Sequence, residues 1–258
     1  MCGIIYEKSE ATLQIKDLQG YNLWYKKGIE TMQTVEFRVI AHIENDYKEK
    51  FGIPRQSGLV ESLVSRIVFE PEYRNPDAFR GMEGYSHLWL LWHFSEADRG
   101  EEWSPTVRPP RLGGNTRVGV FATRSPFRPN SVGMSSVKLE RFEVDKVLGP
   151  VLYVSGADLL DGTPIFDVKP YLAYVDSHPE ARDGFALNQK EGTLLVEFPA
   201  EWLEKVPLEK REGLIELLSQ DPRPQYQNDP ERVYKMRFGE QEVWFRVDGS
   251  MLTVCKVC

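Results

Sequence analysis

The residues best suited to chemistry lie in short polar segments punctuated by glycine and proline. The two longest are VRPPRLGGN at residues 107–115 and GVFATRSPFRPN at residues 119–130. The shorter ones are PRQ at 54–56, SHLW at 86–89, DLLDGTP at 158–164 and DVKPY at 167–171. Because proline fixes φ, such loops are rigid before a ligand arrives, which suits a binding site. Each segment taken alone could equally be a structured turn.

Arginine is concentrated in the stretch that contains the two longest segments. From Trp103 to Leu139 the chain has no Asp or Glu, whereas the whole chain carries a net charge of −7. The basic residues of this stretch are Arg108, Arg111, Arg117, Arg124, Arg128 and Lys138. A local excess of arginine in an acidic protein predicts an anion-binding surface, with solvated loop arginines as the alternative.

The common cofactor and catalytic signatures are absent. The sequence has no GxGxxG, GxxxxGK[ST], HExxH or GxSxG motif, which argues against a Rossmann-type methyltransferase and against the usual hydrolases. Cys255 and Cys258 have the spacing of a metal pair, but no second pair accompanies them, so we interpret them as an ordinary reduced tail. His87 and His93 fall on one face of an expected strand, where packing is the commoner role. We therefore expect no metal site.

Length and composition indicate a cytoplasmic protein. With 258 residues, 41% of them hydrophobic, the chain can bury a sizeable core without disulfides. No apolar run approaches the roughly 20 residues of a membrane-spanning helix, so we expect no membrane association. Residues 1–30 lack the features of a signal peptide. The three cysteines lie at the chain ends, where they cannot clamp a core.

Hydrophobic alternation predicts a mainly β protein. The expected strands are 35–43, 64–69, 85–94, 117–122, 134–142 and 151–156. Turn-rich links and the scarcity of long helical patterns favour an antiparallel sheet or barrel over a doubly wound fold. We place this core domain at residues 33–175.

A small α+β C-terminal domain is expected at residues 185–258, because the strand pattern dissolves over 176–190. It contains a helix at 208–219, which Asp221-Pro222 ends, and three strands at 232–238, 243–247 and 252–257. Residues 1–31 form an extension outside both domains. A start at Met32, which we favour, would leave this extension untranslated or without fixed structure.

Taken together, the polar segments are specific. Their order and spacing, with Asp221-Pro222-Arg223-Pro224-x-Tyr226 near the C-terminus, resemble the TrmO (TsaA-like) family of tRNA methyltransferases over about residues 33–258. The resemblance implies a single-sheet antiparallel β-barrel that binds S-adenosylmethionine, in a homodimer with the cofactor near the interface. It also implies methylation of the exocyclic nitrogen of N(6)-threonylcarbamoyladenosine, at the position 3′ of the anticodon in tRNA.

The resemblance assigns cofactor contacts to four segments. The residues are Pro54, Arg55 and Gln56, then Ser95 and Glu96, then Arg124, and finally Asp158, Leu159, Leu160 and Asp161. A guanidinium matches the carboxylate of the methionine moiety, while carboxylates and carbonyls suit the ribose hydroxyls, the ammonium and the sulfonium. The family commonly has His-Gln where this chain has Ser95-Glu96, although Ser and Glu can still bond a ribose or an adenine edge. It also has a proline in place of Ser131, so we expect that loop to be slightly looser here.

Three alternating residues, Asp167, Lys169 and Tyr171, are expected on one strand face, lining the pocket for the target base. The attacked nitrogen lies between a purine ring and a carbonyl and still bears a proton, so a nearby base would help. We expect Asp167 or Tyr171 to handle this proton and Lys169 to face the threonyl carboxylate. The alternative is a structural strand end that closes the barrel.

Contacts to the tRNA anticodon loop are expected from the arginine-rich segments. Arg108, Arg111, Arg117 and Arg128 suit phosphates, and Asn130 is expected nearer the base. Arg223 and Tyr226 would add a second contact, unless their motif only docks the C-terminal domain on the core.

Two rival functions are a non-catalytic tRNA or nucleotide adapter and an enzyme of the same fold with another substrate. An adapter would need no pocket for S-adenosylmethionine, so a test of binding of this cofactor distinguishes the first from a methyltransferase. The Asp221-Pro222-Arg223-Pro224-x-Tyr226 motif favours tRNA over another substrate.

Overall fold

The computed structural model describes residues 35–97, 103–109, 112, 115–185, 193–223 and 229–258, together with three strands before residue 27. The chain forms two compact units, Met1–Phe37 and Arg38–Cys258. The first unit contains an antiparallel sheet of β1 (Tyr6–Ser9), β2 (Thr12–Lys16) and β3 (Asn22–Lys26). These three strands differ from a segment without fixed structure, and the start at Met32 stays a prediction.

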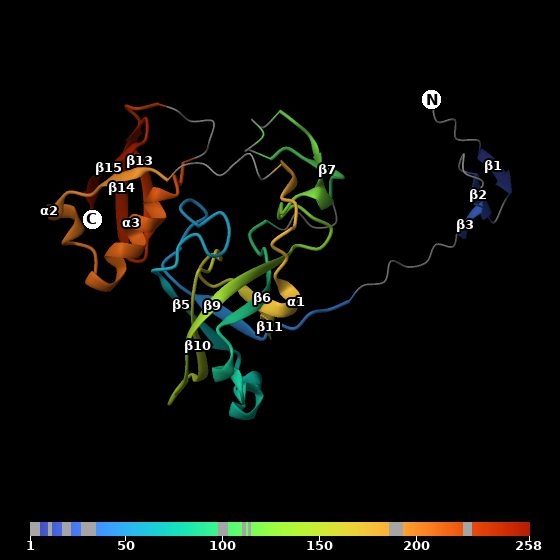
Figure 1. Ribbon diagram of the computed structural model, residues 1–258, viewed down its shortest axis with the longest axis horizontal. Coiled ribbons are helices and arrows are strands. Elements are labelled where there is room, and N and C mark those ends of the chain that lie inside the picture. The colour runs from blue at the N-terminus through green and yellow to red at the C-terminus, as the bar shows by residue number, and fades with distance from the viewer. Residues whose placement is uncertain are drawn as a thin grey trace. The chain divides into compact units, whose positions relative to one another are not determined.

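The second unit is built on a closed six-stranded antiparallel barrel, which confirms the expected mainly β fold (Figure 1). In spatial order its strands are β10 (Gly149–Ser155), β5 (Val64–Phe69), β4 (Ala41–Glu44), β11 (Pro164–Pro170), β6 (His87–His93) and β9 (Val132–Asp145). Pairing of β9 with β10 closes the ring, so the barrel leaves no unpaired edge.

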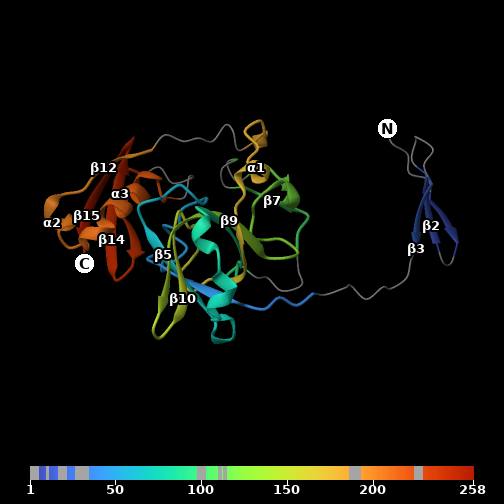
Figure 2. The ribbon, with the colours of Figure 1, turned by 60° about the horizontal axis from the view of Figure 1, so that its bottom comes forward.

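Alternation along each strand fills the barrel interior. In β6, Leu88, Leu90 and Trp92 are buried, and in β5 Ile67 and Phe69 are buried. Burial of a large aliphatic or aromatic side chain contributes about 1.5–3 kcal/mol, so these positions fix the register of both strands. The structure therefore places β5 and β6 where the sequence predicts them. The hairpin of β9 and β10 projects beyond the barrel (Figure 2).

Two predicted strands lose more than half of their length in the structure. Of residues 117–122, only β8 (Val118–Gly119) pairs, with β7 (Thr106–Val107). The last three residues form a 3-10 turn, η5 (Val120–Ala122). The alternation there is real, but the partner strand has only two residues. The strand predicted at 35–43 begins at Ala41, where β11 and β5 first flank it.

The C-terminal region is a small sheet with one main helix, as predicted, but the sheet has a fourth strand that was not predicted and that pairs parallel to its neighbour. The sheet order is β12 (Leu195–Glu197), β15 (Met251–Val257), β14 (Gln241–Asp248) and β13 (Tyr234–Phe238). Helix α3 (Arg211–Ser219) follows the 3-10 turn η7 (Leu208–Lys210), and its Leu214, Leu217 and Leu218 are buried against the sheet. Tyr47, Val60 and Leu63, from loops of the barrel region, join the same hydrophobic cluster.

Short elements make the remaining connections. They are the 3-10 turns η1 (Pro71–Tyr73), η2 (Pro76–Phe79) and η3 (Met82–Gly84), and the helices α1 (Ala173–Asp176) and α2 (Ala200–Leu203). Within the described residues, no helix has the length and apolarity needed to cross a membrane.

Candidate functional site

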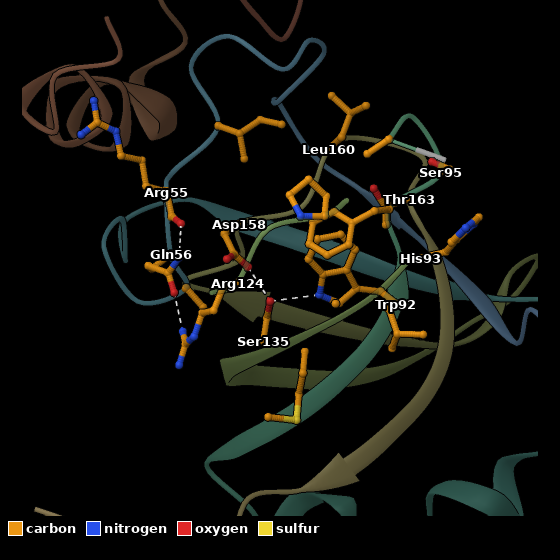
Figure 3. Close-up of a pocket in the computed structure, with 18 of the residues that line it drawn as sticks. Arg55, Gln56, Trp92, His93, Ser95, Arg124, Ser135, Asp158, Leu160 and Thr163 are labelled. Carbon is orange, nitrogen blue, oxygen red and sulfur yellow. Dashed lines mark hydrogen bonds between the residues drawn. The ribbon is translucent and has the colours of Figure 1, made fainter. Parts of the chain in front are cut away.

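A cavity of about 760 Å³ lies at one end of the barrel (Figure 3). In an antiparallel barrel the last residues of β6 and β10 meet the first residues of β9 and β11 at the same end. The walls come from these strand ends and from the adjoining loops. The lining residues fall at 50, 53–57, 89, 92–97, 123–124, 126–128, 132–136, 158, 160 and 163. The volume is in the range of pockets that hold a cofactor-sized molecule.

Most residues expected to contact a cofactor line this cavity. Eight of the ten do so, namely Pro54, Arg55, Gln56, Ser95, Glu96, Arg124, Asp158 and Leu160. The other two hold the loop that carries Asp158 and Leu160. Leu159 is fully buried in the barrel core. The Asp161 carboxylate accepts hydrogen bonds from Lys48 Nζ at 2.7 Å and from the backbone N–H of Asn45 at 2.8 Å.

A chain of hydrogen bonds fixes the Asp158 carboxylate in the cavity wall (Figure 3). The Trp92 indole donates to Ser135 Oγ at 3.0 Å, and the Ser135 hydroxyl donates to Asp158 Oδ1 at 2.6 Å. Burial raises the pKa of the Asp158 carboxyl, while the Ser135 hydrogen bond and the charge of Arg124 oppose this shift. A fixed and poorly solvated carboxylate is suited to binding a cation or a pair of hydroxyls.

Arg124 supplies the opposite charge to the same cavity. Its guanidinium donates to Gln56 Oε1, and Gln56 Nε2 donates to the backbone carbonyl of Arg55 at 2.5 Å. Gln56 thus orients the guanidinium, which lies on the exposed side of the wall. The cavity can therefore bind a molecule that carries both a carboxylate and a cationic or hydroxyl group.

Arg55 borders the cavity and also binds the C-terminal region. Its Nη2 donates to the backbone carbonyls of Asp221 at 2.8 Å and Arg223 at 3.1 Å. Asp221 adopts a left-handed φ of 49°, and its carboxylate pairs with the Arg223 guanidinium at 2.9 Å. These bonds favour the alternative raised from the sequence, in which the Asp-Pro-Arg motif docks the C-terminal domain.

Comparison with known proteins places the chain in a family. Residues 42–177 match the family model of the tRNA-methyltransferase O N-terminal domain, and residues 191–258 match that of the TrmO C-terminal domain. This chain belongs to the TrmO family.

Alignments of this chain with individual relatives span nearly the whole length of each relative. The chain is 44% identical over 228 residues to a tRNA (adenine(37)-N6)-methyltransferase of Escherichia coli. This alignment covers 85% of this chain and 96% of the relative. It is 40% identical over 231 residues to a putative S-adenosylmethionine-dependent methyltransferase, RcsF, of Pseudomonas aeruginosa, over 84% of this chain and 95% of the relative. A crystal structure of TrmO from Pseudomonas aeruginosa superposes with a TM-score of 0.71 at 31% identity, over 88% of this chain and all of that one.

The three residues expected to act on the target base in this TrmO chain lie together on the outer face of the barrel. Lys169 is opposite Trp89 in the register of β11 with β6, and Lys169 Nζ pairs with Asp167 Oδ2 at 2.7 Å. The Tyr171 ring centroid is 5.4 Å from that of Trp89. Among the described residues that line the cavity, Trp89 is present but these three are not. Trp89 therefore neighbours both the cavity and two of the expected residues, Lys169 and Tyr171, whereas Asp167 is opposite Leu91.

The expected tRNA contacts are more dispersed. Arg128 lines the cavity and donates to the carbonyl of Thr123 at 2.7 Å. Arg108, Arg117 and Asn130 are exposed. Arg223 is only 8% exposed and is held by Asp221, so it is not placed to reach a phosphate. The two other residues expected here, Arg111 and Tyr226, lie outside the described residues.

Three of the residues of the TrmO cavity that sequence reasoning missed carry polar groups in its buried wall. Trp92, Ser135 and Thr163 line it, and the serine and threonine are 2% and 3% exposed. A serine at an inward-facing strand position is a detectable signal, because a buried hydroxyl requires a hydrogen-bond partner. That signal could be recognised only once the register of β9 was known.

Proposed function

We propose that this chain transfers the methyl group of S-adenosylmethionine to the exocyclic nitrogen of N(6)-threonylcarbamoyladenosine, 3′ of the anticodon in tRNA. The observation that carries the proposal is the cavity, which gathers eight expected cofactor contacts from four separate segments. Relatives named as tRNA (adenine(37)-N6)-methyltransferases support the position that is modified. The family resemblance also supports a homodimer and a cytoplasmic location.

The residues of the cavity fit S-adenosylmethionine. Arg124, oriented by Gln56, would hold the carboxylate, and Asp158 would hold the ammonium or the ribose hydroxyls. Trp92 and Phe94, with ring centroids 4.2 Å apart, add an apolar wall. When bound, the cofactor supplies an electrophilic methyl group.

The protein must position the nucleophile and remove its proton. An in-line displacement depends mainly on holding the two reacting atoms in contact, which suits a cavity with rigid walls. Asp167 or Tyr171 would accept the proton and Lys169 would face the threonyl carboxylate. Two neighbours of Trp89, which lines the cavity, support these roles. The Tyr171 ring packs near the Trp89 ring, and Lys169 is opposite Trp89 in the strand register.

The variants Asp167→Asn and Lys169→Ala are expected to lower kcat/KM for tRNA by about 100-fold and 10-fold, because one loses a proton acceptor and the other a charge contact. The dissociation constant of S-adenosylmethionine is expected to stay unchanged in both. Asp145→Asn, at the tip of the β9–β10 hairpin, is the matched control. Unchanged turnover in a folded Asp167→Asn protein would remove this residue from the mechanism.

The substrate is tested by mass spectrometry of tRNA nucleosides. Purified protein is incubated with S-adenosylmethionine and with tRNA that either bears or lacks the threonylcarbamoyl group. We expect a product heavier by one methyl, formed only from the modified tRNA and only with the cofactor. Product from the unmodified tRNA alone would assign plain adenosine as the substrate. No product from either tRNA, with cofactor binding intact, would move the substrate to another RNA or a small molecule.

A further inference from the structure

Two large aromatic side chains remain on the surface of the arginine-rich segment. Phe121 is 71% exposed and Trp103 is 50% exposed, and their ring centroids are 6.0 Å apart with an interplanar angle of 37°. Exposed rings add little to the hydrophobic core, since most of their area stays in water. Neighbouring exposed aromatic residues therefore indicate a surface that binds something.

The turn that carries Phe121 is fixed from both sides. Val120 is 1% exposed, and its amide donates to the Pro105 carbonyl at 2.9 Å, which ties the turn to the segment after Trp103. The Thr123 hydroxyl donates to the Val120 carbonyl at 2.8 Å. The two rings are thus presented on a preorganised backbone, which lowers the entropy cost of binding a ligand.

The rings adjoin the cavity through Arg128. The Arg128 guanidinium carbon lies 5.9 Å from the centroid of the Phe121 ring, and Nη1 is held by the Thr123 carbonyl at 2.7 Å. Arg128 and Thr123 both line the cavity. A ligand on the rings would therefore continue toward the place where methyl transfer is proposed.

Charge selects the class of ligand. No Asp or Glu occurs from Trp103 to Leu139, so no carboxylate of this segment repels a phosphate backbone. Arg108 and Arg117 are exposed and directly flank the paired strands β7 and β8. Unpaired RNA is bound by this combination of basic groups and aromatic faces, because every base can stack and every nucleotide carries a phosphate.

We propose that Trp103 and Phe121 form a stacking platform for an unpaired base of the anticodon loop next to the methylated adenosine, with the Arg128 guanidinium at its edge. The proposal rests on the proposed function, because it takes the tRNA loop as the substrate. Stacking on the platform would hold the loop open while the target base enters the cavity.

The test compares variants that keep or remove an aromatic face. Phe121→Ala and Trp103→Ala are each expected to raise the KM for an anticodon stem-loop RNA by about 10-fold to 100-fold, with little change in the dissociation constant of S-adenosylmethionine. Phe121→Tyr is expected to retain the original KM, whereas Phe121→Leu is expected to behave like the alanine variant. Tyr174→Ala, which removes an aromatic side chain that is 85% exposed on α1, is the control.

Three results would overturn the platform. They are an unchanged KM in both alanine variants, a Phe121→Leu variant that performs like the original protein, and a change of native particle size on replacing Phe121, which would place the ring in a subunit interface. Direct binding of the stem-loop, followed by fluorescence anisotropy, keeps the platform testable apart from catalysis. If the original chain binds the RNA but does not methylate it, the proposed function fails, while a weaker affinity of the alanine variants still supports the platform.

Discussion

Replacing Arg124 with alanine is expected to weaken the binding of S-adenosylmethionine by about 10-fold to 100-fold. A hydrogen bond to a charged group contributes about 1.5–3 kcal/mol, and each 1.4 kcal/mol changes a dissociation constant by about tenfold. The Arg124 guanidinium lies in the cavity wall and is oriented by Gln56, so it is prepared to meet a carboxylate with two parallel donors. Isothermal titration calorimetry with the cofactor alone measures the effect.

Two further variants show whether the effect belongs to this arginine. Arg117→Ala removes an exposed arginine of the same acid-free segment that is not among the residues lining the cavity, so cofactor affinity is expected to stay unchanged. Arg124→Lys is expected to be intermediate, since an ammonium keeps the charge but not the planar fork. An Arg124→Ala protein that binds the cofactor within twofold of the original would refute the assignment.

The fold was predictable where a strand or helix has one buried face. Residues 64–69 alternate clearly and form β5 over the same bounds, and Leu214, Leu217 and Leu218 form the buried face of α3 as expected. Prediction failed where pairing partners decide the outcome. Residues 120–122 alternate like a strand, but β7 offers only two partner residues, so the chain turns instead.

The motifs predicted which segments line one cavity, whereas the cofactor contacts of the individual side chains stay predictions. The family resemblance located Gln56, Arg124 and Asp158 in one place without any knowledge of the barrel. It could not show that Arg223 is buried in an ion pair, because that depends on how the C-terminal domain docks. It also could not show that Ser135 supports Asp158, because this contact depends on barrel closure.

Replacing Asp158 with asparagine is expected to stabilise the cofactor-free protein at neutral pH and to weaken cofactor binding. Burial raises the pKa of the Asp158 carboxyl above its unfolded value of about 3.9. The folded state therefore binds the proton more tightly, and this contribution to stability is lost as pH rises from the unfolded pKa through the raised folded pKa. Asparagine is neutral at every pH, so it removes the cost of burying an ionised carboxylate, and its amide oxygen can still accept the Ser135 hydrogen bond. Calorimetry is expected to show a Tm higher by about 2–4 °C for each kcal/mol gained.

Asp176→Asn is the control, for which the opposite change in melting temperature is expected at pH 7. Hydrogen bonds from the Leu172 amide and the Trp89 indole lower the pKa of the Asp176 carboxyl, so its contribution is present at neutral pH and lost on acidification. This variant is expected to melt at a lower temperature at pH 7.

The gain in thermal stability from Asp158→Asn is expected to disappear below about pH 4, where the unfolded carboxyl is also protonated. A lower Tm of Asp158→Asn at pH 7 would contradict the prediction. A more stable variant with weaker cofactor binding would instead show that this charge is kept for the ligand, because the fold alone is more stable without it.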